Sequence, residues 1–150
     1  MIKILKTSSE HKDFKILVEE LDTYLSITDG EEHAFYDQFN GIDNLKHVVI
    51  AYKNDKAVGC GAFKAFDTNS VEIKRMYTIP MYRGKGIATK IISALENWAS
   101  ELNYQNCVLE TGKRQVDAVK FYKKKNYKHI PNYGQYVGME NSLCFKKRLN

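Results

Sequence analysis

The chain has 150 residues with a formal net charge of +5, and 43% of them are hydrophobic, which is enough to fill one core. No apolar run is long enough to cross a membrane, and the N-terminus lacks the apolar stretch of a signal peptide, so we expect one cytoplasmic domain over residues 1–150 with no membrane partner. The positive charge admits an anionic partner, such as nucleic acid or a phosphorylated cosubstrate, without choosing between them.

The first third of the chain predicts a strand followed by one or two helices. Residues 1–6 alternate between apolar and polar side chains, as a strand does. Apolar residues recur at helical spacing over Lys12–Leu25. An Asp-Gly turn signal within residues 26–32 ends this pattern, and residues 31–39 form a candidate second helix.

Three runs rich in β-branched and aromatic residues follow and predict strands over residues 47–52, 57–66 and 71–79. A polar turn at residues 53–56 separates the first two runs. The simplest interpretation of such a pair is a β-hairpin.

The second half of the chain alternates helices with strands. One apolar stripe predicts a helix that begins near Gly86 and passes Leu102. Residues 106–111 read as a buried strand, residues 115–125 as a helix and residues 142–149 as a last strand. The strand–helix–strand order over residues 71–111 implies a parallel pair. We therefore expect an α/β protein with a mixed, mostly antiparallel sheet and helices on both faces.

The stretch YTIPMYRGKGIAT, residues 77–89, joins a predicted strand to a predicted helix. Amide groups at a helix N-terminus lack helical partners, glycines allow close approach, and Arg83 and Lys85 add positive charge, so the stretch is suited to a phosphate group. The spacing of a Walker A motif is absent. The dinucleotide fingerprint matches Gly84 and Gly86 but meets Thr89 at its third glycine. An ordinary strand-to-helix turn stays open as an alternative.

The cysteines and histidines favour neither a disulfide framework nor a metal site. The three cysteines are odd in number and far apart, and the four histidines have no zinc-ligand spacing. We interpret all seven as packing or surface residues and expect no metal.

The glycine stretch does not stand alone. Arg83–Ala88 matches the Q/R-x-x-G-x-G/A signature of the GNAT superfamily, the acyl-CoA-dependent N-acyltransferases, and MYTIPMY before it resembles the end of that family's fourth strand. The strand CVLET and the helix that carries Ala118 and Phe121-Tyr122 are similar to the family's second block. The resemblance covers the whole chain. It is specific over residues 71–127 and rests on element order alone in the first 45 residues.

The resemblance implies a parallel strand pair splayed at the site of acetyl-CoA. It also implies which residues bind acetyl-CoA: the pyrophosphate would meet the backbone of Arg83, Gly84, Lys85, Gly86, Ile87 and Ala88, and the pantetheine arm that of Met76, Tyr77 and Thr78. Thr89 would add a hydroxyl, or is an ordinary helix residue. Gln115 stands where the family often has an asparagine that contacts pantetheine, and Lys125 is our first choice for the 3′-phosphate. Asn126-Tyr127 replaces the family's frequent Gly-Phe, and asparagine also tolerates the left-handed end of a helix.

The resemblance further implies catalytic and acceptor residues. Tyr122 would assist the departing thiolate, and is otherwise a core aromatic. Glu72 would act as base through a water molecule, or is a surface carboxylate in an ion pair. Strand alternation predicts that Glu72, Lys74, Met76 and Thr78 share one face. The acceptor would lie between an acidic wall formed by Asp29, Glu31 and Glu32 and two tyrosines, Tyr133 and Tyr136. The alternative is that these residues belong to ordinary polar loops.

The function that these residues predict is an N-acetyltransferase. A primary amine, free or on a peptide, would attack acetyl-CoA directly in a ternary complex, with the amide of Met76 stabilising the oxyanion. The alternative is a binding module, either a basic nucleic-acid binder or a scaffold that senses acyl-CoA without turnover. The lysine-rich stretch KFYKKKNYKH mixes basic and aromatic residues, as nucleic-acid-binding segments do. Its Phe121 and Tyr122, however, fall on the apolar side of their helix, so we expect no nucleic acid as a partner. The sequence leaves the acceptor open, and a homodimer is expected from base rates.

Overall fold

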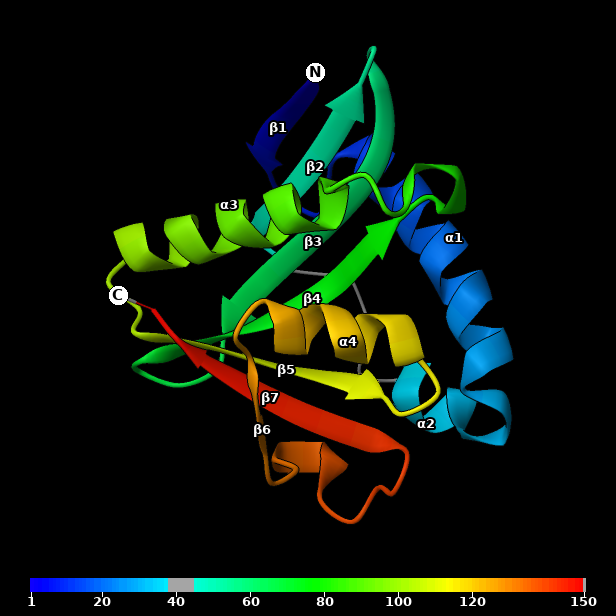
Figure 1. Cartoon of the computed structure of the whole chain (residues 1–150), viewed down its shortest axis with the longest axis vertical. Coiled ribbons are helices and arrows are strands. Elements are labelled where there is room, and N and C mark those ends of the chain that lie inside the picture. Colours follow the sequence, from blue (N-terminus) through cyan, green and yellow to red (C-terminus); the bar gives the residue numbers. More distant parts are fainter. Residues whose placement is uncertain (38–44, 150) are drawn as a thin grey trace.

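A seven-stranded sheet with the strand order β1-β2-β3-β4-β5-β7-β6 forms the centre of the protein (Figure 1). The structure is a computed structural model that describes residues 1–37 and 45–149. Its strands are β1 (Ile2–Thr7), β2 (His47–Lys53), β3 (Lys56–Ala65), β4 (Ser70–Thr78), β5 (Asn106–Gly112), β6 (Lys128–Ile130) and β7 (Ser142–Arg148). Its α-helices are α1 (Lys12–Thr28), α2 (His33–Asp37), α3 (Ile87–Glu101) and α4 (Val116–Lys124). Short 3-10 helices occupy Gly30–Glu32 (η1), Pro80–Tyr82 (η2) and Gly134–Tyr136 (η3).

One strand pair in the sheet is parallel. β4 and β5 run in the same direction and are joined by α3, whereas the other neighbouring strands are antiparallel. The expected mixed, mostly antiparallel sheet is therefore confirmed. The pairing of the strands therefore changes from antiparallel to parallel between β4 and β5 and back to antiparallel between β5 and β7.

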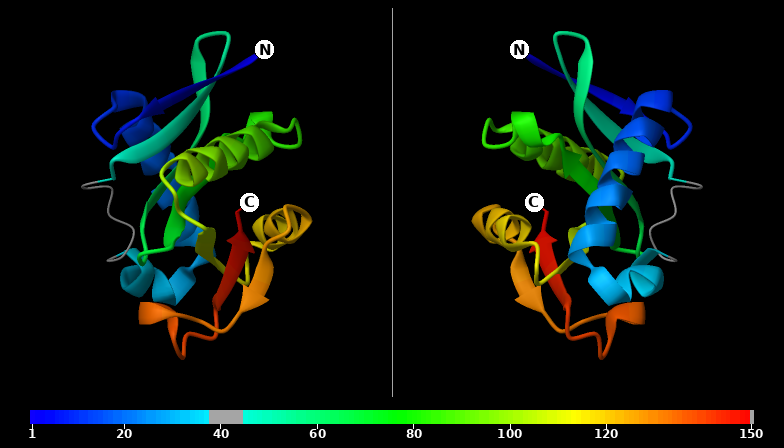
Figure 2. Two further views of the ribbon diagram at one scale, coloured as in Figure 1. Left: turned by 90° about the vertical axis from the view of Figure 1, so that its left-hand side faces the viewer. Right: turned by 90° about the vertical axis from the view of Figure 1, so that its right-hand side faces the viewer.

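Helices cover both faces of the sheet, as expected. α3 and α4 lie on one face, and α1 and α2 lie on the other (Figure 2). α3 buries one stripe against the sheet: Ile87, Ile91, Ile92, Leu95 and Ala99. α1 buries a second stripe: Phe14, Leu17, Val18 and Leu21. Each fully buried side chain of this size contributes about 1.5–3 kcal/mol, so the two stripes hold the helices to the sheet.

The predicted hairpin at residues 53–56 is confirmed. β2 and β3 pair as antiparallel neighbours, and Asn54 and Asp55 between them have φ angles of 50° and 65°. Asparagine and aspartate are the side chains that best tolerate this left-handed conformation. Asn126 likewise has a φ angle of 73° just after α4, as its place at the end of that helix suggested.

Some boundaries differ from those predicted. α1 continues three residues beyond Leu25, to Thr28, because the Asp-Gly turn signal acts only at Asp29 and Gly30. The second helix spans His33–Asp37 rather than residues 31–39, of which 38 and 39 lie outside the described residues. β6 was not predicted, since three residues are too few to show a period. None of the described helices is long and apolar enough to cross a membrane.

Candidate active site

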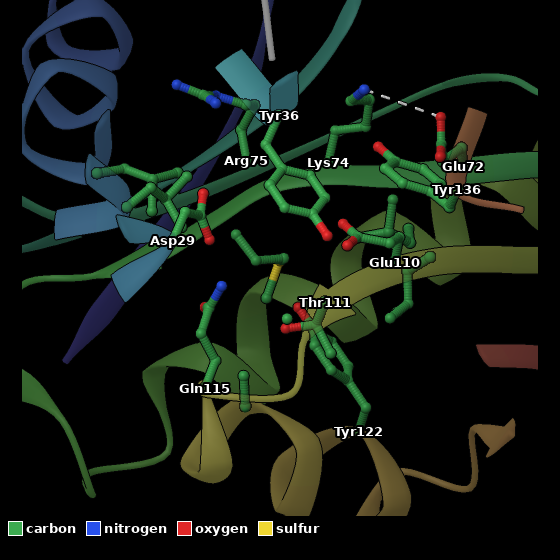
Figure 3. A pocket seen from close by; sticks show the side chains of 17 residues that line it. Asp29, Tyr36, Glu72, Lys74, Arg75, Glu110, Thr111, Gln115, Tyr122 and Tyr136 are labelled. Atoms are coloured by element: carbon green, nitrogen blue, oxygen red, sulfur yellow. Dashed lines mark ion pairs between the residues drawn. The ribbon is translucent and has the colours of Figure 1, made fainter. Parts of the chain in front are cut away.

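The parallel strands β4 and β5 part shortly after they begin. Their ladder pairs Ser70, Val71 and Glu72 with Asn106, Cys107 and Val108, and no pair follows. Beyond this point a cavity of about 110 Å³ opens between the strands (Figure 3). The cavity therefore lies where the parallel pair was expected to splay.

A β-bulge in β4 decides which side chains face the cavity. The register between β3 and β4 shifts between Cys60 and Ala62, and Arg75 on the opposite strand has a φ angle of 59°. An extra residue in one strand reverses the alternation of all that follow. Lys74 and Arg75 consequently both point to the α1 face, where Lys74 meets Glu72 and Arg75 forms an ion pair with the α1 residue Asp22.

The prediction that Glu72, Lys74, Met76 and Thr78 share one face is therefore wrong. Met76 packs against the core beneath α3 and α4, whereas Glu72 and Lys74 lie on the opposite face. The prediction assumed an unbroken ladder, and the bulge breaks it at Arg75.

Because β4 and β5 have parted, the cavity passes through the sheet. Its wall on the α4 side is largely apolar, and its members belong to or pack against the core there: Ile73, Met76, Leu109, Ala118 and Tyr122. Its wall on the α1 and α2 side carries most of the charge: Asp29, Glu72, Lys74, Arg75 and Glu110, with Tyr36 and Tyr136. Groups on the two faces of the sheet can thus act on one molecule.

Glu110 is the ionisable residue that the sequence analysis missed. Burial, with the negative charges of Asp29 and Glu72, raises its pKa to about 7, although Ser142 hydrogen-bonds to it and Lys74 lowers it. A carboxyl group with this pKa can take up and release a proton near neutral pH. The signal that could have found it is its place in CVLET: it follows the buried Leu109, points to the other face and lies near the carboxyl end of a parallel strand.

Glu72 is held more firmly than Glu110. Its Oε2 accepts a hydrogen bond of 2.8 Å from the hydroxyl of Tyr133, and its Oε1 lies 3.9 Å from the Nζ of Lys74. The side chain of Glu72 is buried. Glu72 therefore ties the loop between β6 and β7 to β4.

Tyr122 lies on the α4 side of the cavity, and the residue is only 7% exposed. The ring makes edge contacts with Phe121 and Tyr127, at centroid distances of 5.3 and 5.8 Å. Burial, and secondarily the charge of Glu110, raises the pKa of Tyr122 far above its ordinary value. Its hydroxyl is therefore protonated at neutral pH.

The glycine stretch leaves open space at the start of α3. Gly84 and Gly86 have φ angles of 76° and 81°, and a Cβ built on either would meet no atom within 4 Å. No side chain caps the amide groups of the first turn of α3. These amides, with the positive end of a 15-residue helix, suit an anionic group such as a pyrophosphate.

Arg83 and Lys85 are positioned by aromatic rings. The Nε of Arg83 donates a hydrogen bond of 2.9 Å to the carbonyl of Thr78, and its guanidinium lies over Tyr24 and Tyr77. The Nζ of Lys85 lies 5.5 Å from the ring centre of Tyr82. The side chain of Arg83 therefore fastens the loop to the end of β4.

Of the other predicted binding residues Gln115, Ile87, Thr89 and Lys125, only Gln115 lines the cavity. Gln115 lines the cavity just before α4. Ile87 is buried, so only its backbone can meet a ligand, and Thr89 lies in the first turn of α3. Lys125 caps the far end of α4 with its Nζ 5.9 Å from the ring centre of Phe121, outside the cavity.

The structure only partly assembles the predicted acceptor wall. Asp29 is buried and lines the cavity, but Glu31 and Glu32 lie in η1 and do not. Tyr136 lines the cavity, and Tyr133 binds Glu72 behind it. The acidic residues that the cavity brings together are instead Asp29, Glu72 and Glu110.

The cysteines of the chain lie in the interior, and its acidic, histidine and cysteine side chains do not gather into a metal-binding group within the described residues. The described residues contain no group of three His, Cys, Asp or Glu side chains that could hold a metal ion. All three cysteines are buried, and burial raises the pKa of Cys60 and Cys107 to about 12 and that of Cys144 to about 11. A protonated thiol is a poor nucleophile, so none of the three cysteines is activated for attack.

Comparisons with known proteins agree with this geometry. Residues 14–127 match the acetyltransferase (GNAT) family. The chain is 30% identical over 136 residues to an IAA acetyltransferase of Azospirillum brasilense, covering 89% of this chain and 88% of that protein. It shares its fold with a solved structure from Klebsiella pneumoniae (TM-score 0.84, 24% identity, 100% and 99% of the two chains). It also shares its fold with the PaiA N-acetyltransferase of Thermoplasma acidophilum, solved in complex with coenzyme A (TM-score 0.70, 19% identity, 99% of each chain).

The raised pKa of Glu110 predicts a pH dependence of stability. A carboxyl group whose folded pKa is raised stabilises the fold below its unfolded pKa, near 4.5, and loses this contribution as the pH rises through about 7. Relative to Glu110→Gln, the parent should lose up to about 1.4 kcal/mol of unfolding free energy per pH unit over this interval. Urea denaturation at a series of pH values measures the difference. Glu140→Gln, at an exposed site, is the control, and equal slopes for all three proteins would contradict the prediction.

Proposed function

The chain belongs to the acetyltransferase (GNAT) family and is an acyltransferase, and from this premise we propose that it moves the acetyl group of acetyl-CoA to a small primary amine. The observation that carries the proposal is the cavity through the sheet, with the protonated Tyr122 on one face and Glu110 on the other. All the strands that the structure describes belong to one sheet, which favours a single domain over residues 1–150. A cytoplasmic location and a homodimer stay predictions from the sequence.

We assign acetyl-CoA to the face of the sheet that α3 and α4 cover. The uncapped amides and open glycine turn at Arg83–Ala88 suit its pyrophosphate, with Thr89 beside them. Beyond Glu72, β4 has no ladder partner on β5, so the backbone of Met76–Thr78 has an edge to offer the amides of the pantetheine arm. Gln115, just before the first residue of α4, lines the same cavity. Lys125 remains our assignment for the 3′-phosphate.

Two residues on opposite faces of the sheet would assist the reaction, Glu110 by accepting a proton and Tyr122 by donating a hydrogen bond. An amine arrives as an ammonium ion and must lose a proton before its nitrogen can attack the acetyl carbonyl. Glu110 suits this task better than Glu72, because its pKa is near 7 and Glu72 is already bound by Tyr133 and Lys74. The amide of Met76 would donate a hydrogen bond to the carbonyl oxygen as negative charge develops there.

Tyr122 would support the departing thiolate from the other face. A thiol has an ordinary pKa of roughly 8.5, well below that of the buried Tyr122 phenol, so complete proton transfer from the phenol is unfavourable. Tyr122 would therefore act chiefly by donating a hydrogen bond to the developing negative charge. The thiolate then takes a proton from solvent, and the acylated nitrogen gives up its excess proton to leave a neutral amide.

The charge of the acceptor wall favours a compact, cationic amine. Three carboxyl groups line this wall, those of Asp29, Glu72 and Glu110. Of the two cationic lining residues, Lys74 lies near Glu72, and Arg75 is neutralised by Asp22 of α1. The volume of about 110 Å³ suits a small molecule better than a folded protein segment.

Thiol release from acetyl-CoA tests the proposed function. The acceptors should be three amines of equal length that differ only at the far end: 1,4-diaminobutane, butylamine and 4-aminobutanoate. We expect turnover, with the highest kcat/KM for the diamine and the lowest for the carboxylate. If the protein binds acetyl-CoA but releases no thiol with any of the three amines, the result would instead support a scaffold that senses acyl-CoA.

The glycine turn predicts a variant that loses acetyl-CoA. Gly86→Glu would place a side chain and a negative charge in the open space where the pyrophosphate is assigned. Calorimetry should show the affinity for acetyl-CoA falling at least tenfold, or about 1.4 kcal/mol. Gly138→Glu is the matched control, because Gly138 has a similar φ angle of 83° and also faces open space. Unchanged affinity in folded Gly86→Glu would remove acetyl-CoA from this loop.

The role of Tyr122 predicts a variant that binds but turns over slowly. Tyr122→Phe keeps the ring and its packing and removes only the hydroxyl, so acetyl-CoA affinity should stay nearly intact. Turnover should fall, by about 10²–10⁴-fold for a full general acid and by less where water substitutes. An acyl donor with a more acidic thiol should partly restore the rate, since such a thiolate needs less support. Tyr127→Phe is the control, because Tyr127 belongs to the same aromatic cluster but does not line the cavity. Parent-like turnover by Tyr122→Phe would make Tyr122 a core aromatic.

A further inference from the structure

We propose that Arg114 is a positioning residue that holds the acceptor wall of the cavity in place for acetyl transfer, an inference that rests on the proposed function. Arg114 lies in the connection between β5 and α4 and does not itself line the cavity. It would act on the reaction only through the segment that it holds.

The contact that carries the inference joins two distant parts of the chain. The Nη1 of Arg114 donates hydrogen bonds of 3.0 Å to the carbonyls of Thr28 and Asp29, at the end of α1. The last turn of α1 contains no basic residue. Arg114 thus brings positive charge to the negative end of a 17-residue helix, where carbonyl groups lack helical partners.

The residues on either side of this contact line the cavity. Asp29 projects its buried side chain into the charged wall, and Tyr36 follows it in α2. Gly112 and Gln115, which flank Arg114 in sequence, line the opposite side. One guanidinium therefore spans from the α1–α2 connection to the β5–α4 connection.

This link matters because the sheet does not supply it. β4 and β5 pair only as far as Glu72 and Val108, so no hydrogen bond between these two strands sets the width of the cavity further along. The acceptor nitrogen must come within roughly 3–3.5 Å of the acetyl carbon, and a displacement of about 1 Å can cost orders of magnitude in rate. A side chain that fixes the spacing of the two walls is therefore suited to setting how well the amine is held.

Gly30 makes room for the same contact. Its φ angle is 57°, and a Cβ built on it would lie 3.3 Å from the Nη1 of Arg114. A side chain at this position would press against the guanidinium. Gly30→Ala would also strain the backbone at this positive φ angle, so it does not isolate the contact with Arg114.

Two measurements on Arg114→Ala, Arg114→Lys and Lys113→Ala test the inference. Lys113 is the matched control, since it is the neighbouring exposed cation in the same connection. Hydrogen exchange of the amides of residues 29–37 should become about tenfold faster in Arg114→Ala and stay unchanged in Lys113→Ala. With the best of the three amines as probe, the KM for the amine should rise about tenfold in Arg114→Ala while the Kd for acetyl-CoA stays within about twofold. Arg114→Lys should recover most of both losses, because an ammonium group can also donate to the two carbonyls.

The outcomes separate this inference from the proposed function. Exchange and amine KM in Arg114→Ala equal to those of Lys113→Ala would overturn the inference and leave the function standing. Faster exchange with an unchanged amine KM would also overturn it, since Arg114 would then be only a helix cap. Should Arg114→Ala fail to fold, Arg114→Gln decides in its place, since it removes the charge and shortens the side chain, with the same rise in amine KM expected. A parent protein that turns over none of the three amines would overturn the proposed function on which the inference rests.

Discussion

The parting of β4 and β5 is the constraint on which the rest of the site depends. A parallel pair that kept its ladder would fill the space with backbone hydrogen bonds and leave no passage between the two faces of the sheet. The ladder ends after Glu72, and the bulge at Arg75 then turns Met76 toward α3 and α4. Because of this break, an apolar wall that suits an acyl-CoA arm and a charged wall that suits an amine border one cavity.

Gathering several carboxyl groups in the charged wall destabilises the fold, and interactions with neighbouring side chains offset part of this destabilisation. Burial, together with the nearby negative charges of Asp29 and Glu72, raises the pKa of Glu110. Glu72 is compensated by Lys74 and by the hydroxyl of Tyr133. The same arrangement that destabilises charge on Glu110 makes it a usable proton acceptor, whereas the compensated Glu72 serves to hold a loop.

The order and type of most elements follow from the sequence, because each has its own period or turn chemistry. The stripe of α3, the hairpin at Asn54-Asp55 and the parallel pair around α3 are such cases. What the sequence could not give depends on contacts between distant residues. The bulge at Arg75 leaves no local signal, so strand alternation assigned Met76 to the wrong face. Glu31 and Glu32 are neighbours of Asp29 in sequence, but only Asp29 lies at the cavity.

Where β4 and β5 part, side-chain hydrogen bonds connect the segments around the cavity in place of backbone hydrogen bonds between the two strands. Tyr133 reaches Glu72 from the β6–β7 loop, Tyr36 shares a 2.8 Å hydrogen bond with Ser142, and Arg114 grips the end of α1. Side-chain hydrogen bonds are individually modest, at about 0.5–1.5 kcal/mol for neutral partners and more for charged ones. A cavity held by a few such bonds is easier to adjust than one held by a ladder, because a single substitution can move one wall and leave the sheet intact.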